Sequence, residues 1–139
     1  MQANYKILEH PSDLGIEARG ASLAAAFQNA AQGLMSIILD LSTVESSEMR
    51  ELAVNSSDLD QLLVNWLSEI LYLYDGQRFI CRDFIIQKLT PTGLKAKVRG
   101  EIFSENTHRT KLDVKAVTYH QLFVQENKNG GLVRVYLDI

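Results

Sequence analysis

Two segments of the chain have apolar residues spaced three or four positions apart, which is the period of one face of an α-helix. The first segment is 23–38 and the second is 59–74. For the second helix, Ser56 or Ser57 is the predicted N-cap and Gly76 the predicted stop. Both apolar faces are therefore expected to lie in a hydrophobic core.

Elsewhere apolar and polar residues alternate, as in a strand that buries one face. The predicted strands are 5–9, 15–19, 50–55, 79–89, 94–103, 112–117, 122–126 and 132–139. Pro91 and Gly93 predict a hairpin between the fourth and fifth of them. Two early helices and hairpin-connected late strands describe an α+β fold, with both helices on one face of a largely antiparallel mixed sheet. We expect a single domain over residues 1–139, because no linker or repeat divides the chain.

Composition and charge narrow the class of protein. Apolar residues make up 46% of the chain and charged residues 22%, which is ordinary for a globular domain. The net charge of −3 argues against nucleic-acid binding over the whole surface, so any RNA role is local or acts through a partner. The one cysteine, Cys81, lies in an apolar run and is expected to be a buried thiol. Without a signal-peptide core or a long apolar run, we expect a soluble, cytoplasmic protein without membrane contact.

One predicted strand has a basic side. In the strand 94–103, Lys95, Lys97 and Arg99 point away from the apolar residues with which they alternate. This side is either a contact surface for an acidic partner or RNA, or a solvated face that protects the sheet from aggregation. The sequence leaves both interpretations open.

Few residues of the chain carry obvious chemistry. The three histidines, His10, His108 and His120, lie in or beside predicted loops, and no two have the spacing of metal ligands on one helix. The chain has no glycine-rich phosphate-binding loop and no Gly-x-Ser-x-Gly turn. Nucleotide-binding and serine-hydrolase activities are therefore disfavoured.

The end of the chain is acidic. Asp138 lies on the polar side of the last predicted strand, and the α-carboxylate of Ile139 follows it. If the first loop approaches this end, Asp13 adds a second side-chain carboxylate. Clustered carboxylates repel one another unless a cation lies among them, and oxygen ligands suit Ca²⁺ or Mg²⁺. The alternative is that Asp13 caps a turn and Asp138 pairs with Arg134 or a lysine.

Several short motifs lie near the two ends of the chain. They are His-x-x-Asp-x-Gly at 10–15, Gly-Glu at 100–101, Lys-Ala-Val-Thr-Tyr-His at 115–120 and Asp-Ile at 138–139. In this order and spacing they resemble the archease family, small accessory proteins of the RNA-splicing ligase that joins tRNA exon halves. The resemblance covers nearly the whole chain. One departure is Pro11-Ser12 in the first motif, where the family more commonly has Thr-Ala.

The resemblance implies a divalent-cation site. Asp13, Asp138 and the main chain of Ile139 would hold the ion, which is Ca²⁺ or Mg²⁺, with Mn²⁺ as a third option. We also expect a partner-binding surface in which the basic residues anchor an acidic partner or RNA. Its residues are His10, Glu101, His108, Arg109, Lys111, Lys115 and His120.

The function implied by the resemblance is that of a non-enzymatic, metal-binding accessory protein without catalytic residues of its own. It would activate an RtcB-type RNA-splicing ligase in tRNA splicing and RNA repair, by promoting guanylylation of the ligase and restoring multiple turnover. A second implied role is modulation of a tRNA methyltransferase, and RNA would be reached indirectly through these partners.

Two other functions stay open. One is a stand-alone metal-dependent phosphoester hydrolase, with Asp13 and Asp138 on the metal and His10 or His120 as the base. The other is a general chaperone, which would suppress aggregation of unrelated proteins and need no metal.

Overall fold

The computed structural model describes residues 4–9 and 13–139 of the chain. In these residues the elements, in order, are β1 (Tyr5–Glu9), β2 (Asp13–Gly20), α1 (Leu23–Ile38), a short 3₁₀ helix (Leu41–Thr43), β3 (Glu48–Asn55), α2 (Leu59–Gln77), β4 (Phe79–Thr90), β5 (Gly93–Ile102), β6 (Ala116–Asn127) and β7 (Gly130–Asp138). No helix in this part of the chain is long and apolar enough to cross a lipid bilayer.

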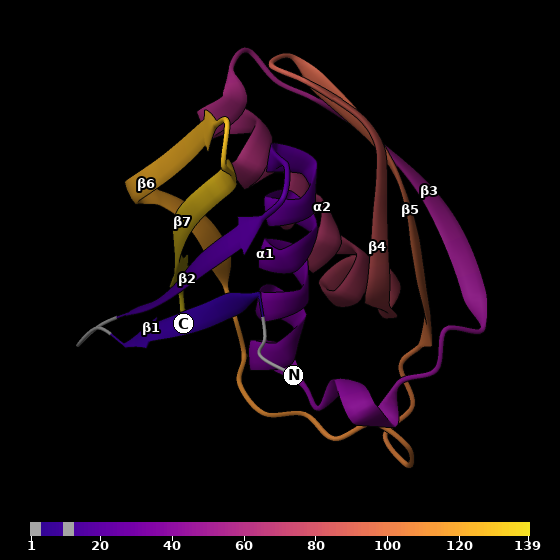
Figure 1. Ribbon diagram of the computed structural model, residues 1–139. Coiled ribbons are helices and arrows are strands. Elements are labelled where there is room, and N and C mark those ends of the chain that lie inside the picture. The colour runs from indigo at the N-terminus through magenta and orange to yellow at the C-terminus, as the bar shows by residue number, and fades with distance from the viewer. Residues whose placement is uncertain (1–3, 10–12) are drawn as a thin grey trace.

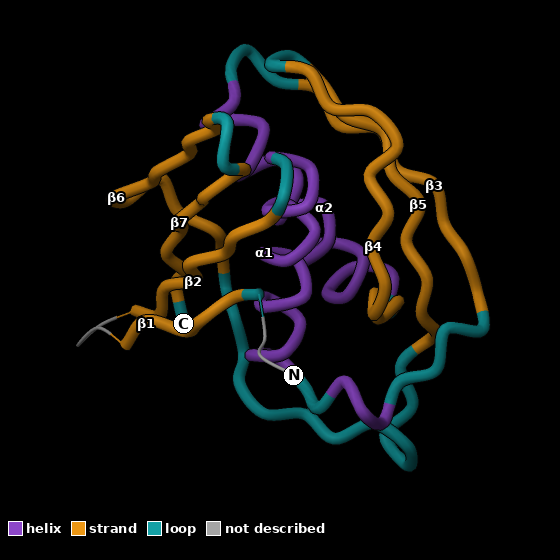
Figure 2. The backbone as a smooth tube through the Cα atoms, viewed as in Figure 1, coloured by secondary structure: helices purple, strands orange, loops and turns teal. Residues whose placement is uncertain are grey.

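The strands form two separate sheets, and the two helices lie between them (Figure 1; Figure 2). The four-stranded sheet has the order β1-β2-β7-β6, and the three-stranded sheet has the order β3-β5-β4. Every pairing between the described strands is antiparallel. The predicted α+β class is confirmed, whereas the prediction of one mixed sheet with helices on a single face is wrong. Alternation of apolar residues reveals which side of a strand is buried, but not which other strand it pairs with.

Both helices bury apolar residues against both sheets. Helix α1 packs on β2 and β7 on one side and on β4 on the other, and α2 packs on β6, β4 and β3. Trp66 of α2 is fully buried, and its Nε1–H donates a hydrogen bond to the carbonyl of Phe27 in α1 at 3.0 Å. The Trp66 ring also makes an edge-to-face contact with Phe84 of β4, with centroids 6.2 Å apart. One continuous core therefore joins the two layers of strands through the helices.

Both predicted ends of α2 are wrong by one or two residues. Its N-cap is Asp58, whose carboxylate accepts a hydrogen bond from the backbone N–H of Gln61 at 2.8 Å. The helix continues through Gly76 and ends at Arg78, which has the left-handed φ of 55°. The guanidinium of Arg78 stacks on the ring of Phe103, 4.4 Å from its centroid, and this contact holds a non-glycine residue in that conformation.

The strand predicted at 112–117 is also wrong. The chain between β5 and Ala116 crosses from one sheet to the other without forming a strand, apart from an isolated bridge between Thr110 and Leu39. The long strand β6 then pairs with β7 over both of its halves, with a register shift between Thr118 and Phe123. The prediction that Cys81 is a buried thiol is confirmed, and burial raises its pKa to about 12.

Candidate metal centre

The structure brings Asp13 and Asp138 together at one end of the four-stranded sheet. They are direct cross-strand partners in the antiparallel register of β2 and β7. Directly opposite residues of such a pair project from the same face of the sheet, with Cβ atoms about 5 Å apart. The two ends of the chain therefore meet here.

Backbone pairing holds this end of the sheet in place. Asp138 also pairs with Ala116 of β6, and its carbonyl accepts a hydrogen bond from the Lys115 N–H at 2.7 Å. Asp13 is half-buried, with its Oδ1 atom shielded from solvent, whereas Asp138 and Ile139 are exposed. The pair thus has one carboxylate anchored in the fold and one open to the surroundings.

The donor chemistry of this pair fits a hard divalent cation. Two carboxylates and the main-chain oxygens of the adjacent Ile139 form an all-oxygen set, which suits Ca²⁺, Mg²⁺ or Mn²⁺. Two like charges directly opposite on a sheet are destabilising unless a cation compensates them. Within the described residues no cluster of three or more His, Cys, Asp or Glu side chains occurs, so the site would rely on these two carboxylates. His10 lies outside the described residues.

Aromatic side chains lie next to the acidic pair on the same face. The ring of Tyr136 covers Gly15, where a Cβ atom would come within 2.7 Å of that ring. His120 makes an edge contact with Tyr136, with ring centroids 6.0 Å apart. His120 precedes Gln121, whose left-handed φ of 50° lies within the register shift of β6. The irregularity of β6 thus places His120 against the face that carries the acidic pair.

A charge cluster that the sequence did not reveal lies on the same face, two residues beyond Gly15 along β2. Glu17, only 7% exposed, accepts a hydrogen bond from Arg134 Nη2 at 2.7 Å and forms an ion pair with Lys6 at 3.1 Å. The hydrogen bond from Arg134 lowers the pKa of Glu17 despite the opposing effect of burial. Arg134 therefore pairs with Glu17, and not with Asp138 as one interpretation of the sequence had it.

Two of the predicted partner-binding residues, Glu101 and His108, contact each other in a network within the fold. His108 is buried; its Nδ1 accepts a hydrogen bond from the Ser104 N–H at 2.9 Å, so the proton is on Nε2, which contacts Glu101 Oε2 at 2.7 Å. The backbone N–H of Glu45 also donates to this carboxylate, and together these bonds lower the pKa of Glu101. The side chain of His108 is 1% exposed and fixes the crossing segment after β5, and a role for Glu101 and His108 in partner binding stays a prediction.

The predicted basic anchors are exposed and lie on the crossing segment. Arg109 pairs with the backbone of Asp40 through its carbonyl, and the Nζ of Lys111 donates to the carbonyl of Ser36. Lys115 immediately precedes β6 and lies beside the acidic pair. Lys115 is therefore the predicted anchor that the structure brings nearest to Asp138 in the sheet, and a role for these three residues in partner binding stays a prediction.

Comparison with known proteins places the chain in a family. The model of the archease protein family (MTH1598/TM1083) matches residues 5–139. The chain is 39% identical over 138 residues to an archease of Saccharolobus islandicus, covering 98% of this chain and 99% of that protein. It is 34% identical over 139 residues to an archease of Methanosarcina acetivorans, covering 97% and 95%.

Solved structures give the same result. The solution structure of protein 1598 of Methanobacterium thermoautotrophicum has a TM-score of 0.84 at 29% identity, with 99% of this chain and 100% of that chain covered. A crystal structure of an archease, possible chaperone, of Thermotoga maritima has a TM-score of 0.67, covering 96% of each chain. At 18% identity this second likeness concerns the fold alone. The family model and the relatives together show that the chain belongs to the archease family.

Proposed function

We propose that the chain is a non-enzymatic accessory protein that holds a divalent cation between Asp13 and Asp138 and activates an RtcB-type RNA-splicing ligase. The observation that carries the proposal is the direct cross-strand pairing of these two carboxylates. Membership of the archease family supports the choice of partner. Modulation of a tRNA methyltransferase is a second role of the same kind, in which the chain again acts on an enzyme rather than as one.

The chain would contribute to such a reaction by placing the divalent cation. A divalent cation would supply charge compensation at a transferring phosphate, where small displacements change the rate strongly. Asp13 and Asp138 lie on paired strands, which fix carboxylates more closely than a free loop does. The exposed side of Asp138 leaves room for groups from a partner.

The surroundings of the acidic pair suit protein contact. Ile139 is 39% exposed, and Tyr119, on the irregular part of β6, is 58% exposed. Exposed apolar and aromatic side chains of this kind serve as anchors in protein interfaces. Lys115, which is also exposed, adds a cation beside the acidic pair that would contact an acidic surface of the ligase. RNA would then be reached through the ligase.

The proposal is tested by measuring guanylylation of a purified RtcB-type ligase from labelled GTP, with and without this protein, at matched metal concentration. Asp13→Ala and Asp138→Ala are expected to abolish stimulation while the far-ultraviolet circular dichroism stays unchanged. Asp60→Asn, which removes an exposed carboxylate from the first turn of α2, is the control and keeps full stimulation. Full stimulation by both alanine variants would remove the cation from the mechanism.

Two assays separate the competing functions. Turnover of phosphodiesters by the purified protein alone, lost in Asp138→Ala, would favour a metal-dependent hydrolase. The Thermotoga maritima relative is described as a possible chaperone, and suppression of aggregation of an unrelated protein in the presence of a chelator would favour that role here. The accessory function predicts neither result.

A further inference from the structure

Two lysines lie side by side on the outer face of the three-stranded sheet, at its hairpin end. Lys88 of β4 and Lys95 of β5 are direct cross-strand partners, whereas Lys97, which follows on the same face, lies opposite Glu51 of β3. In the part of the chain that the structure describes, neither Lys88 nor Lys95 forms an ion pair. Two like charges directly opposite one another cost stability, and in a chain of net charge −3 this positive surface is local.

The fold fixes the direction of these lysines. Leu94 and Ala96 alternate with them along β5 and are buried in the core, so Lys95 and Lys97 face outward. A register shift between Ile86 and Lys88 inserts an extra residue into β4, and it turns Lys88 outward beside Lys95. The lysine pair is thus set by core packing and a bulge rather than by flexible surface chain.

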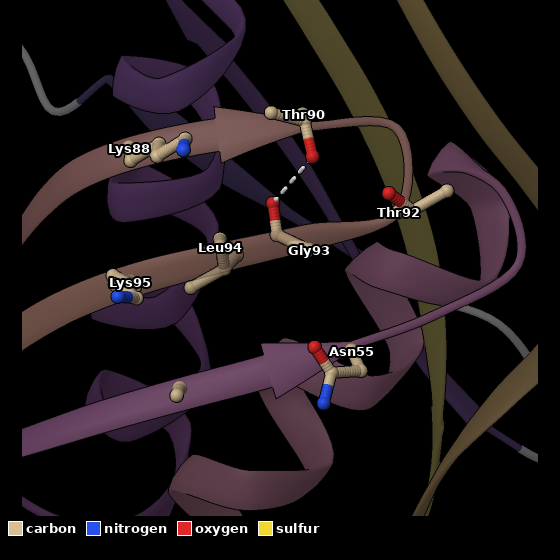
Figure 3. Close-up of a pocket in the computed structure, with 8 residues that line it drawn as sticks. Asn55, Lys88, Thr90, Thr92, Gly93, Leu94 and Lys95 are labelled. Atoms are coloured by element: carbon tan, nitrogen blue, oxygen red, sulfur yellow. Dashed lines mark hydrogen bonds between the residues drawn. The ribbon is translucent and has the colours of Figure 1, made fainter.

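A groove of about 240 Å³ adjoins the lysine pair at the hairpin end of the sheet (Figure 3). Besides Lys88 and Lys95, its polar side chains are Asn55, Thr90 and Thr92. All five are able to donate hydrogen bonds, and no carboxylate lines the groove. The side chains of Asn55 and Thr92 form no hydrogen bond with any described residue, so their donors are open to a ligand.

We propose that this groove binds the phosphodiester backbone of a single-stranded nucleic acid. Two ammonium groups flanked by hydroxyl and amide donors match phosphate oxygens, for which lysine acts as a point charge. No aromatic side chain lines the groove, so base stacking does not contribute and binding is independent of base sequence.

The groove suits an acidic protein less well. A protein partner needs an exposed apolar side chain as an anchor, and the exposed Met49 and Ile85 on this sheet lie outside the groove lining. The groove belongs to the three-stranded sheet, on the other side of the helices from the acidic pair of the four-stranded sheet (Figure 1). The proposal is therefore independent of the cation site, and its test needs neither ligase nor metal.

The test is fluorescence anisotropy of a short labelled oligouridylate in chelator at two salt concentrations. Two lysines on two phosphates give a slope of log affinity against log salt of about −1.4, so affinity falls about sevenfold between about 50 and 200 mM salt. The double variant Lys88→Gln/Lys95→Gln removes both charges, so its slope is close to zero and its affinity changes little with salt. Oligoadenylate is expected to bind with the same affinity as oligouridylate.

A matched pair of charge reversals localises the site. Lys95→Glu and Lys128→Glu change the net charge equally, and Lys128 lies in the turn between β6 and β7, on the other sheet. Only Lys95→Glu is expected to weaken binding. Amide chemical shifts on adding the oligonucleotide are expected to move at Thr92, Gly93 and Lys95.

Several results would overturn the proposal. They are no binding at about 50 mM salt, an unchanged slope in the double variant, equal losses from both charge reversals, or shifts confined to the four-stranded sheet. Displacement of the oligonucleotide by a polyglutamate peptide of equal charge, at equal or lower concentration, would show that the groove binds an acidic protein rather than a nucleic acid. Displacement by inorganic phosphate at the same phosphate concentration would show that the groove binds free phosphate rather than a nucleic-acid backbone.

Discussion

The variant Asp138→Asn separates the two states of the acidic pair, because its effect on stability is expected to change sign when a cation binds. In chelator, Asp13 and Asp138 are like charges directly opposite on one sheet face, a pairing that costs about 0.2–1 kcal/mol. Removing one charge relieves this repulsion. The exposed position of Asp138 means that the neutral amide is accommodated without loss of packing.

The expected shift of the melting temperature follows from the chain length. An unfolding entropy of about 2.1 cal/mol/K per residue gives about 0.3 kcal/mol/K for 139 residues. In chelator, Asp138→Asn therefore melts about 1–3 °C above the parent. A cation present at about 100 times its dissociation constant stabilises the parent by about 2.7 kcal/mol, or about 9 °C, and the variant by much less. The order of the two melting temperatures reverses.

Differential scanning calorimetry of both proteins in chelator, Ca²⁺, Mg²⁺ and Mn²⁺ tests this reversal. Asp60→Asn is the control, and the difference between its melting temperature and that of the parent must be the same with and without cation. Equal cation-induced shifts in the parent and in Asp138→Asn would refute the reasoning about the site. A lower melting temperature of the variant in chelator would refute the reasoning about repulsion.

Three further predictions concern the fold that supports the site. Glu17→Gln is expected to cost about 1.5 kcal/mol at pH 7 by weakening the bond to Arg134. Because the folded-state pKa of Glu17 is lowered, its contribution is complete above its ordinary value of 4.5 and is lost as the pH falls through the lowered one. Urea unfolding at pH 7 and in acid measures this, and a cost that persists in acid would contradict it. Gly100→Ala would put a Cβ atom 1.6 Å from the carbonyl oxygen of Ile80, so we expect little soluble protein, and normal yield with an unchanged melting temperature would be the contrary result. Trp66→Ala is expected to cost about 3–5 kcal/mol in urea unfolding, through loss of a fully buried ring and its hydrogen bond, and a cost below about 1 kcal/mol would show that the core collapses around the gap.

Local patterns in the sequence were sufficient to predict both helices and most of the strands. The alternation along 132–139 predicts that Val133, Val135, Leu137 and Ile139 share one face. The first three are fully buried, whereas Ile139, which follows the end of β7, is 39% exposed. The sequence raised the expectation that the end of the chain approaches the first loop and brings two acidic residues together. The register of β2 and β7 places these residues, Asp13 and Asp138, opposite each other. That the pair binds a cation stays a prediction.

The helix ends show where local signals compete. Ser56, Ser57 and Asp58 are all good N-caps, and the choice falls on Asp58, whose carboxylate reaches the N–H three residues on. Gln61, three residues after Asp58, is the sequence signal that points to Asp58 as the N-cap. Its side chain accepts a hydrogen bond from the N–H of Ser57, one residue before the cap. The C-terminal end depends on Arg78, whose contact with Phe103 is non-local and is not visible in the helix sequence.

Which strands pair with one another could not be predicted from the sequence, for a different reason. Sheet membership depends on contacts between residues far apart in the chain, and alternation is the same whichever partner a strand takes. The pair of Glu17 and Arg134 is separated by 117 positions, so no spacing rule links them. The network of His108 and Glu101 is closer in sequence, yet it needs the backbone of Glu45 to complete it.

The position of β7 has a consequence for synthesis of the protein. It is the last strand along the chain, yet it lies in the interior of the four-stranded sheet, between β2 and β6. During translation β1 and β2 leave the ribosome before β7 does, so one edge of β2 stays unpaired until β7 inserts beside it. The acidic pair forms only when β7 pairs with β2, so a chain that lacks β7 cannot present the two carboxylates together.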